Sequence, residues 1–128
     1  MRLLLDTHVL LWMLDDSPKL GRRARELMTA RGAECFASAV SFWEIAIKAG
    51  LRRKDFRVDA ERLIDACLAA GLRLLPFVPA HAVRMARLPR HHADPFDCAL
   101  IAQAQVEPLT LLTRDARLAN YGSVVRVA

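Results

Sequence analysis

Five short apolar runs that alternate with segments of helical periodicity constrain the fold of this chain more than any other feature. The apolar runs cover residues 2–5, 34–37, 72–75, 109–113 and 124–127. Most of the segments between them place apolar side chains three and four residues apart, as amphipathic helices do. These predicted helices cover residues 7–14, 18–30, 40–50, 59–70, 80–88, 94–104 and 116–120. Alternating strands and helices predict an α/β fold in which helices cover both faces of a mainly parallel, five-stranded sheet.

A helix start is encoded at Asp94-Pro95. An aspartate just before a helix accepts hydrogen bonds from its first backbone N–H groups, and proline is favoured at the first helical position. Asp97 follows in the first turn, where a carboxylate interacts favourably with the helix dipole. Capping therefore accounts for both aspartates, but it does not exclude a second use of the same carboxylates.

Length and composition indicate one ordinary folded domain over residues 1–128. A chain of 128 residues with 54% hydrophobic side chains buries enough surface to fold alone. No apolar run approaches the roughly 18 residues that a membrane span needs. The start of the chain lacks the long apolar core and small-residue cleavage site of a signal peptide. We therefore expect a cytoplasmic protein with no membrane association.

The charge balance is basic, with a formal net charge of +5 and an isoelectric point near 9.7. Basic residues cluster within residues 22–25, 52–57 and 84–90. A basic surface favours polyanions, of which nucleic acid is the commonest. The three cysteines are widely spaced and form no CxxC pair, so neither a zinc site nor a disulfide framework is predicted.

Four carboxylates follow predicted strands or lie on the helices beyond them. Asp6 follows the strand at 2–5, and Asp115 follows the strand at 109–113. If these strands are neighbours where the strand order reverses, both side chains reach the crevice in which such sheets bind ligands. Glu44 and Asp97 lie on helices that begin beyond strands. Carboxylates that converge suggest a site for a hard divalent cation, although Asp6 and Asp115 also suit helix caps and Glu44 a solvated helix position.

Four motifs resemble those of PIN-domain ribonucleases, in particular the VapC-type toxins of toxin–antitoxin pairs. Residues 3–12 (LLLDTHVLLW) resemble the opening of that family, and residues 41–48 (SFWEIAIK) resemble its second acidic motif. Residues 92–104 (HADPFDCALIAQA) resemble the third, and residues 112–115 (LTRD) resemble the fourth. The motifs occur in the family's order and spacing along nearly the whole chain.

The resemblance implies a three-layer α/β/α fold and a Mg²⁺- or Mn²⁺-dependent endoribonuclease. It implies that the catalytic, metal-binding acidic positions are Asp6, Glu44, Asp97 and Asp115. Asp94 is left open between a helix cap and a ligand that acts through water. Contacts with substrate or with the acidic side chains are expected from Thr7, Lys48, Thr113 and Arg114. For Lys48 an ion pair with Glu44, one helical turn earlier, is an equal alternative to a phosphate contact.

The resemblance also implies an RNA substrate, a homodimer and a cognate antitoxin that places a basic side chain among the carboxylates. The apolar surface of the predicted helices at 7–14 and 18–30 supports such partners. Cys98 departs from the pattern, because an arginine is expected there in this subgroup, and the change weakens a phosphate or packing contact.

Competing interpretations differ in the residues they need. A phosphatase of the haloacid-dehalogenase type needs a second aspartate at the position of His8, and a receiver domain needs one after the run at 72–75, which has none. A catalytically silent RNA- or protein-binding module stays open. His8 is interpreted as structural in preference to a proton shuttle, and the pair at 91–92 as a solvated loop. The aromatic side chains that we assign to the core or an interface, in preference to base stacking, are Trp12, Trp43 and Phe96.

Overall fold

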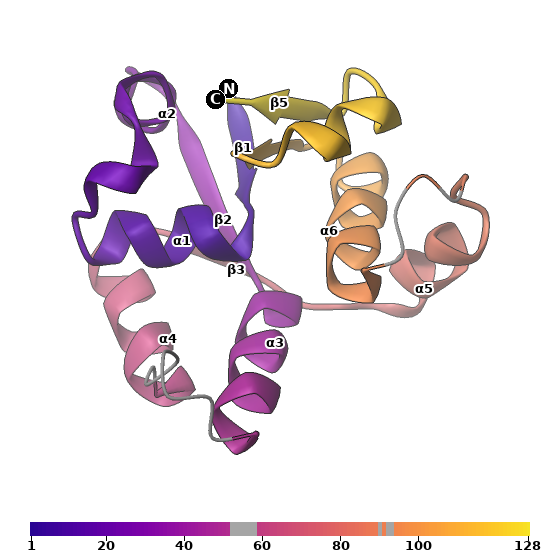
Figure 1. Cartoon of the computed structure of the whole chain (residues 1–128), viewed down its shortest axis with the longest axis horizontal. Coiled ribbons are helices and arrows are strands. Elements are labelled where there is room, and N and C mark those ends of the chain that lie inside the picture. The colour runs from indigo at the N-terminus through magenta and orange to yellow at the C-terminus, as the bar shows by residue number, and fades with distance from the viewer. Residues whose placement is uncertain (52–58, 90, 92–93) are drawn as a thin grey trace.

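The computed structural model describes residues 1–51, 59–89, 91 and 94–128, in which strands and helices alternate along the chain (Figure 1). In chain order the elements are β1 (Arg2–Leu5), α1 (Thr7–Leu14), η1 (Pro18–Leu20), α2 (Arg22–Thr29), β2 (Glu34–Ser38), α3 (Ala39–Gly50), α4 (Ala60–Ala69), β3 (Arg73–Leu75), α5 (Pro79–Ala86), α6 (Pro95–Val106), β4 (Thr110–Thr113), η2 (Ala116–Tyr121) and β5 (Val125–Val127). The elements η1 and η2 are 3₁₀ helices.

The predicted helix over residues 18–30 is wrong as one element. Ser17 caps a short 3₁₀ turn, and a separate α-helix begins after Gly21. Gly21 has φ +72°, a left-handed conformation that interrupts the right-handed helix and that glycine adopts without steric cost. Of the three basic clusters, only residues 22–25 and 84–89 lie in the described ranges. The cluster at 52–57 and Arg90 lie outside the described residues.

All five strands are parallel, in the order β3-β2-β1-β4-β5. The chain starts at the central strand, proceeds through β2 to β3 at one edge, and then returns to the other side of β1 as β4. The adjacency of β1 and β4, on which the crevice depends, is therefore present, with Leu5 paired with Leu112. The strand order reverses at this pair, so its carboxyl end is where an open sheet binds ligands.

Two apolar clusters fill the spaces between the three layers. Leu3 and Leu5 point to one face, where they pack with side chains from α1, α2 and α4. Leu4, between them, points to the opposite face and packs with side chains from α5 and α6. The alternation follows from the two-residue period of a strand, and it confirms the predicted three-layer α/β/α fold. In the described ranges, no helix has both the length and the apolar composition to cross a membrane.

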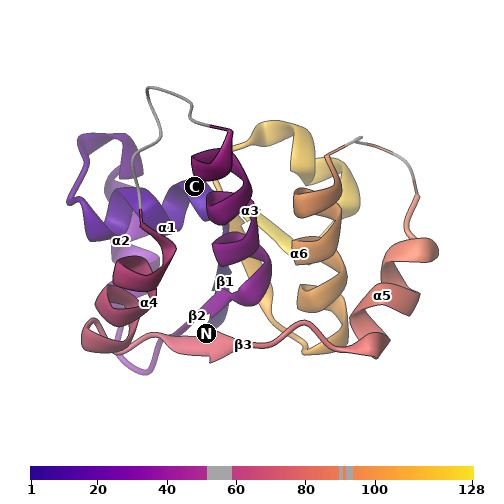
Figure 2. The same ribbon diagram turned by 90° about the horizontal axis from the view of Figure 1, so that it is seen from below.

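Helix α3 lies between the two helical layers at the carboxyl edge of the sheet (Figure 2). Ile45 belongs to the cluster on one side and Val40 to the cluster on the other. Contacts of α3 with both α4 and α6 hold it in this position. The central place of α3 brings Glu44, on the same helix, to the end of β1.

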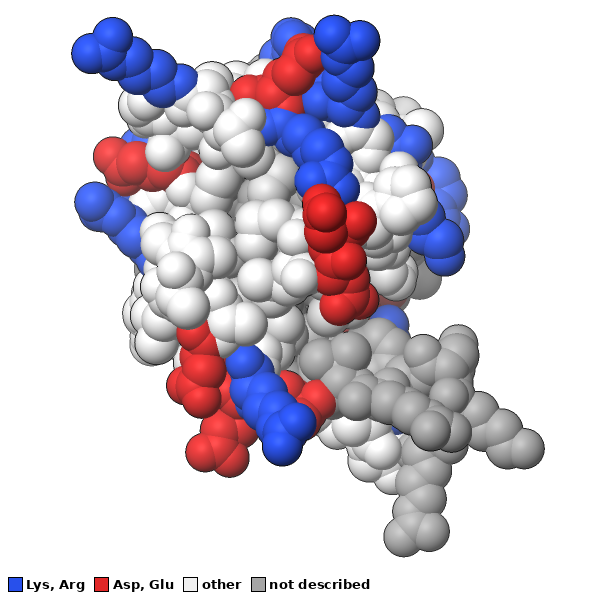
Figure 3. All heavy atoms as spheres, turned by 90° about the vertical axis from the view of Figure 1, so that its left-hand side faces the viewer, with Lys and Arg blue, Asp and Glu red and all other residues white. Residues whose placement is uncertain are grey.

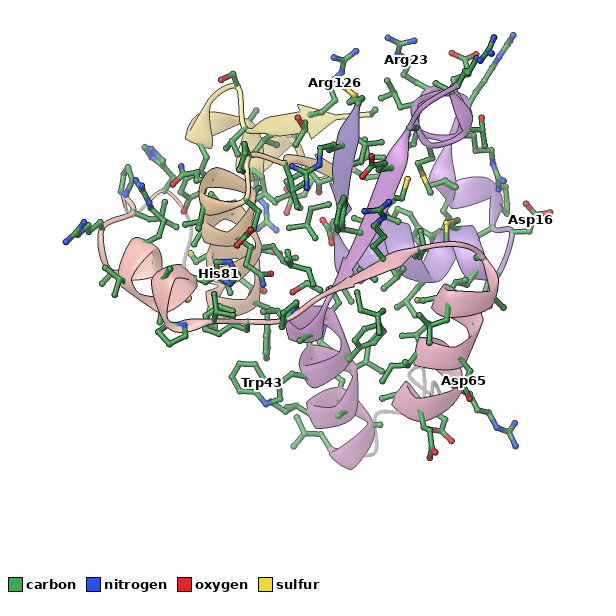
Figure 4. The ribbon with its side chains drawn as sticks, turned by 180° about the vertical axis from the view of Figure 1, so that it is seen from behind. Asp16, Arg23, Trp43, Asp65, His81 and Arg126 are labelled. Atoms are coloured by element: carbon green, nitrogen blue, oxygen red, sulfur yellow. The ribbon has the colours of Figure 1, made fainter. Side chains whose placement is uncertain are left out.

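A buried polar network fixes the start of α3 against α6 and α5 (Figure 4 labels His81). Ser38, the N-cap of α3, donates its hydroxyl to Oε1 of Gln103 on α6. The Gln103 amide donates to the carbonyl of Pro76 at 3.2 Å and lies 3.3 Å from Nδ1 of His81. Nε2 of the fully buried His81 lies 2.6 Å from the Glu107 carboxylate. These bonds hold the two helices that carry Glu44 and Asp97.

Candidate active site

A cleft of about 280 Å³ opens at the carboxyl ends of β1 and β4. It contains all five acidic residues that the sequence singles out, which come from segments far apart in the chain. The residues that line it are Asp6, His8, Trp12, Glu44, Lys48, Asp94, Asp97, Arg114, Asp115 and Arg117. The cleft therefore combines a cluster of carboxylates with three cationic side chains and two aromatic rings.

Asp6 lies at the floor of the cleft, where β1 ends, and is 6% exposed. One carboxylate oxygen accepts from the hydroxyl of Thr113 at 2.5 Å, and the other accepts from the backbone N–H of His8 at 3.2 Å. Burial raises the pKa of Asp6 above its ordinary value, and the negative charge of Glu44 raises it further. The two hydrogen bonds and the charge of the His8 side chain act in the opposite direction. Asp6 is thus both the cap of α1 and a buried acid facing the cleft.

Glu44 is buried on α3, which contradicts its interpretation as a solvated helix residue. Its Oε2 lies 2.6 Å from Nζ of Lys48, one turn later, so the ion-pair alternative for Lys48 is present in the structure. The Glu44 side chain is 8% exposed and the Lys48 side chain 26% exposed. A buried carboxylate that faces another acid needs such a cation.

Asp94 caps α6 as predicted, because its Oδ1 accepts from the backbone N–H groups of Phe96 at 2.8 Å and Asp97 at 3.2 Å. The cap uses one oxygen of Asp94, a residue that also lines the cleft. Asp97 stands in the first turn of α6 and lines the same cleft.

Asp115 follows β4 and caps η2, where its Oδ1 accepts from the backbone N–H of Arg117 at 3.0 Å. The same carboxylate pairs with the Arg117 guanidinium, with Nη2 to Oδ2 at 2.7 Å and Nε to Oδ1 at 3.0 Å. The hydrogen bond and charge of Asp115, with the charges of Asp97 and Asp94, raise the pKa of Arg117. Arg117 was not among the site residues predicted from the sequence, although a residue two positions after a capping aspartate donates its backbone N–H to that aspartate and so lies beside it.

The other expected contact residues divide between the cleft and the core. Thr113 joins two acidic segments, because its hydroxyl donates to Asp6 and accepts from the backbone N–H of Asp115 at 3.0 Å. Thr7 is buried and donates to the Ser41 hydroxyl at 2.8 Å, so it ties α1 to α3 and does not line the cleft. Arg114 lines the cleft.

The remaining ring-bearing residues lie as follows. Trp12 packs against the apolar cluster as expected but also lines the cleft, as His8 does. Trp43 and Phe96 contact each other edge to face, with centroids 5.1 Å apart. His91 packs against Tyr121, which also lies near the Cys98 thiol, and His92 lies outside the described residues.

The donor chemistry of the cleft suits a hard divalent cation, because every acidic group in it supplies oxygen. In the described ranges, however, no group of three or more histidine, cysteine, aspartate or glutamate side chains is placed so that it could hold a metal ion. Three of the carboxylates instead bond side chains of the protein: Thr113 bonds Asp6, Lys48 bonds Glu44, and Arg117 bonds Asp115. The acidic residues are gathered in one cleft, where at least three of them bond side chains of the protein and Asp94 accepts backbone N–H groups.

Comparisons with known proteins agree with this architecture. Among solved structures the fold resembles VapBC2 from Rickettsia felis bound to a promoter DNA fragment, with a TM-score of 0.72, 12% identity, and coverage of 99% of this chain and 98% of that one. It also resembles a toxin–antitoxin complex from Klebsiella pneumoniae, with a TM-score of 0.65, 20% identity, and coverage of 97% of this chain and 95% of that one. FitAcB from Neisseria gonorrhoeae is similar as well, with a TM-score of 0.62, 21% identity, and coverage of 98% of this chain and 95% of that one. No curated protein matches the sequence. The PIN domain family matches residues 3–124, nearly the whole chain, and the protein therefore belongs to the PIN domain family.

Proposed function

We propose that this PIN domain is a metal-dependent endoribonuclease and the toxin of a toxin–antitoxin pair. PIN domains are a family of nucleases, and the observation that carries the proposal here is the composition of the cleft. Acidic residues from four segments meet at the point where the strand order reverses, beside Arg114 and Arg117. Carboxylates suit a divalent ion, and arginines suit the phosphates of a nucleic acid backbone.

In this proposal Asp6, Glu44, Asp97 and Asp115 hold Mg²⁺ or Mn²⁺, with Asp94 contributing through water. The ion, when bound, supplies a nucleophilic water and stabilises the negative charge that develops on the phosphoryl oxygens. Thr113 orients the Asp6 carboxylate through its hydrogen bond.

Three basic side chains supply the charge that binds the substrate. Arg114, Arg117 and Lys48 line the cleft and draw the RNA phosphates toward the carboxylates. Lys48 pairs with Glu44 and Arg117 pairs with Asp115, so both cations stand beside carboxylates that would hold the ion and near the phosphate that they would bind.

The test is cleavage of total RNA with Mg²⁺ or Mn²⁺, in parallel with EDTA and with the Asp6→Asn variant. Asp16→Asn is the matched control, because Asp16 is an exposed aspartate outside the cleft and asparagine tolerates its positive φ. We expect cleavage by the wild type and by Asp16→Asn, and none by Asp6→Asn or with EDTA. Cleavage that survives both EDTA and Asp6→Asn would remove the metal mechanism, and mapping of the cut sites would identify the RNA.

The proposed antitoxin binds on the side of the molecule formed by α1, α2 and α4. A hollow of about 330 Å³ lies there, lined mainly by apolar and small side chains such as Met13, Met28 and Leu72. This side shows a broad uncharged area beside a run of charged side chains (Figure 3). Apolar surface of this kind suits a peptide whose basic end reaches the acidic cleft. The test is co-purification with the product of the neighbouring gene. We expect Met28→Glu to abolish it and Arg84→Glu, an exposed control outside this surface, to leave it unchanged.

A separate apolar hollow supports a homodimer. It measures about 560 Å³, lies between α3, α5 and α6, and is lined almost wholly by carbon, including Trp43 and Phe77. Trp43 is 59% exposed and points away from α3 on this side (Figure 4). An exposed apolar patch of this kind marks an interface. Light scattering should give a dimer for the wild type and for Leu68→Glu on α4, and a monomer for Trp43→Glu. A monomeric wild type at micromolar concentration would refute the dimer.

The second candidate is a catalytically silent module that binds RNA or protein. The absence of a finished metal site among the described residues favours it. Binding of RNA without cleavage, at any concentration of Mg²⁺ or Mn²⁺, is the outcome that would select it.

A further inference from the structure

His8 and Trp12 form a stacked aromatic pair on one wall of the acidic cleft. They stand one turn apart on α1, with ring centroids 5.6 Å apart and ring planes 22° from parallel. Both line the cleft together with the carboxylates and Arg114. Trp12 is partly buried and packs against the apolar cluster under α1, whereas His8 is exposed. The Trp12 ring is therefore the inner ring, held by the apolar cluster, and the His8 ring is the outer one, which a ligand would contact.

The position of the pair next to Asp6 decides what it can contact. The backbone N–H of His8 donates to Oδ1 of Asp6, so the histidine is anchored beside the buried acid at the cleft floor. Arg114 and Arg117, which suit phosphate, lie in the same cleft. A nucleotide whose phosphate reaches the carboxylates and arginines therefore brings an adjoining base to the aromatic wall.

We propose that the His8–Trp12 pair is the stacking platform for an unpaired RNA base beside the scissile phosphate. This inference depends on the proposed ribonuclease function and names a specificity element of the same site. Bases stack on aromatic side chains whatever their identity, because each has a π-face. A base inside a duplex is already covered by its neighbours, so the platform selects single-stranded RNA or a loop. A platform that is already stacked loses little conformational entropy when a base joins it.

The test is a binding cycle in the non-cleaving Asp6→Asn background. Two labelled single-stranded RNAs span the mapped cut site and differ only in one abasic position next to it. We expect His8→Ala to weaken binding of the intact RNA by about tenfold and to leave binding of the abasic RNA unchanged. His8→Phe should bind the intact RNA as the parent does, because it keeps the ring. His91→Ala, which removes a histidine that is not among the cleft-lining residues, should change neither RNA.

The cycle separates a stacking role from a merely structural one. If His8→Ala only disturbed Asp6 or α1, it would weaken both RNAs by the same factor, and that result would overturn the platform. An intact RNA that binds no better than the abasic one would overturn it as well. Cleavage of RNA by the wild type together with either result would leave the ribonuclease proposal standing, whereas a wild type that cleaves no RNA overturns both.

Discussion

Lys48→Met should destabilise the metal-free protein by removing the cation from a buried acid. At 2.6 Å the Coulomb attraction in the Glu44–Lys48 pair is roughly 6 kcal/mol at an effective dielectric of about 20, and desolvation offsets most of it in the intact pair. When lysine alone is removed, Glu44 stays buried without this partner, a change that costs about 3–5 kcal/mol for fully buried pairs. Lys48 is a quarter exposed, so water partly replaces it and we expect a loss of about 2 kcal/mol.

The matched control is Arg22→Met, because Arg22 and Glu26 have the same i,i+4 spacing but are 94% and 49% exposed. We expect its urea midpoint to stay within experimental error of the wild type, and that of Lys48→Met to fall at constant m-value in EDTA. Adding Mn²⁺ should recover part of the loss, because an ion bound at Glu44 replaces the missing charge. Equal midpoint shifts for the two variants would refute the role of burial. An undiminished loss in Glu44→Gln/Lys48→Met, which has no buried charge at this position, would show that packing is the cause.

Three further predictions test the cleft and the core. Burial raises the pKa of Asp6, so the folded protein holds this proton to higher pH than the unfolded chain does, and stability falls as the pH rises from about 4 through the raised pKa. Metal-free Asp6→Asn should therefore be more stable than the wild type at pH 7 and lack this pH dependence; equal urea midpoints at pH 7 would contradict the pKa shift. Gly21→Ala and Gly71→Ala should each cost about 1–3 kcal/mol, because both glycines have a positive φ that L side chains rarely adopt. Only Gly21→Ala should weaken RNA binding, since its Cβ would lie 2.4 Å from Nη1 of Arg114 and displace that side chain, and equal binding by the two variants would speak against it. Burial raises the pKa of the Cys67 thiol to about 11, so a thiol reagent at pH 8 should modify Cys67 only after unfolding in urea, and modification of the native protein at this residue would refute the assignment.

Local sequence signals predicted the elements well because a few neighbouring residues determine them. Asp94-Pro95 predicted the start of α6, and the structure places the cap and the helix there. The apolar runs predicted the five strands to within a residue or two. The wrong prediction of one helix over residues 18–30 also has a local cause. The apolar spacing continues across Gly21, and such spacing carries no information about the positive φ of a single residue.

The candidate site was predictable in part, and mainly through the family resemblance. The five acidic residues were singled out from the sequence, and the structure brings them to one cleft. Their partners were predictable only in part: the i,i+4 spacing gave the Glu44–Lys48 pair as one alternative, and Thr113 was expected near substrate or an acid, but which acid it contacts was not predictable. Thr113 donates to Asp6 across 107 positions of sequence, and Thr7 contacts Ser41 on another helix instead of an acid. The sequence analysis assigned Trp12 to the core or an interface in preference to base stacking, whereas the structure places it both against the apolar cluster and in the wall of the cleft.

The sequence by itself determined where the strands and most of the helices lie, because capping, helical spacing and strand alternation act over a few residues. It also placed an acid at the end of β1 and another after β4. Only the tertiary structure decided that β1 and β4 are neighbours at the reversal of strand order, and hence that Asp6 and Asp115 share a cleft. That decision depends on how the helices pack on both faces of the sheet, and packing between distant segments leaves no periodic pattern in the sequence.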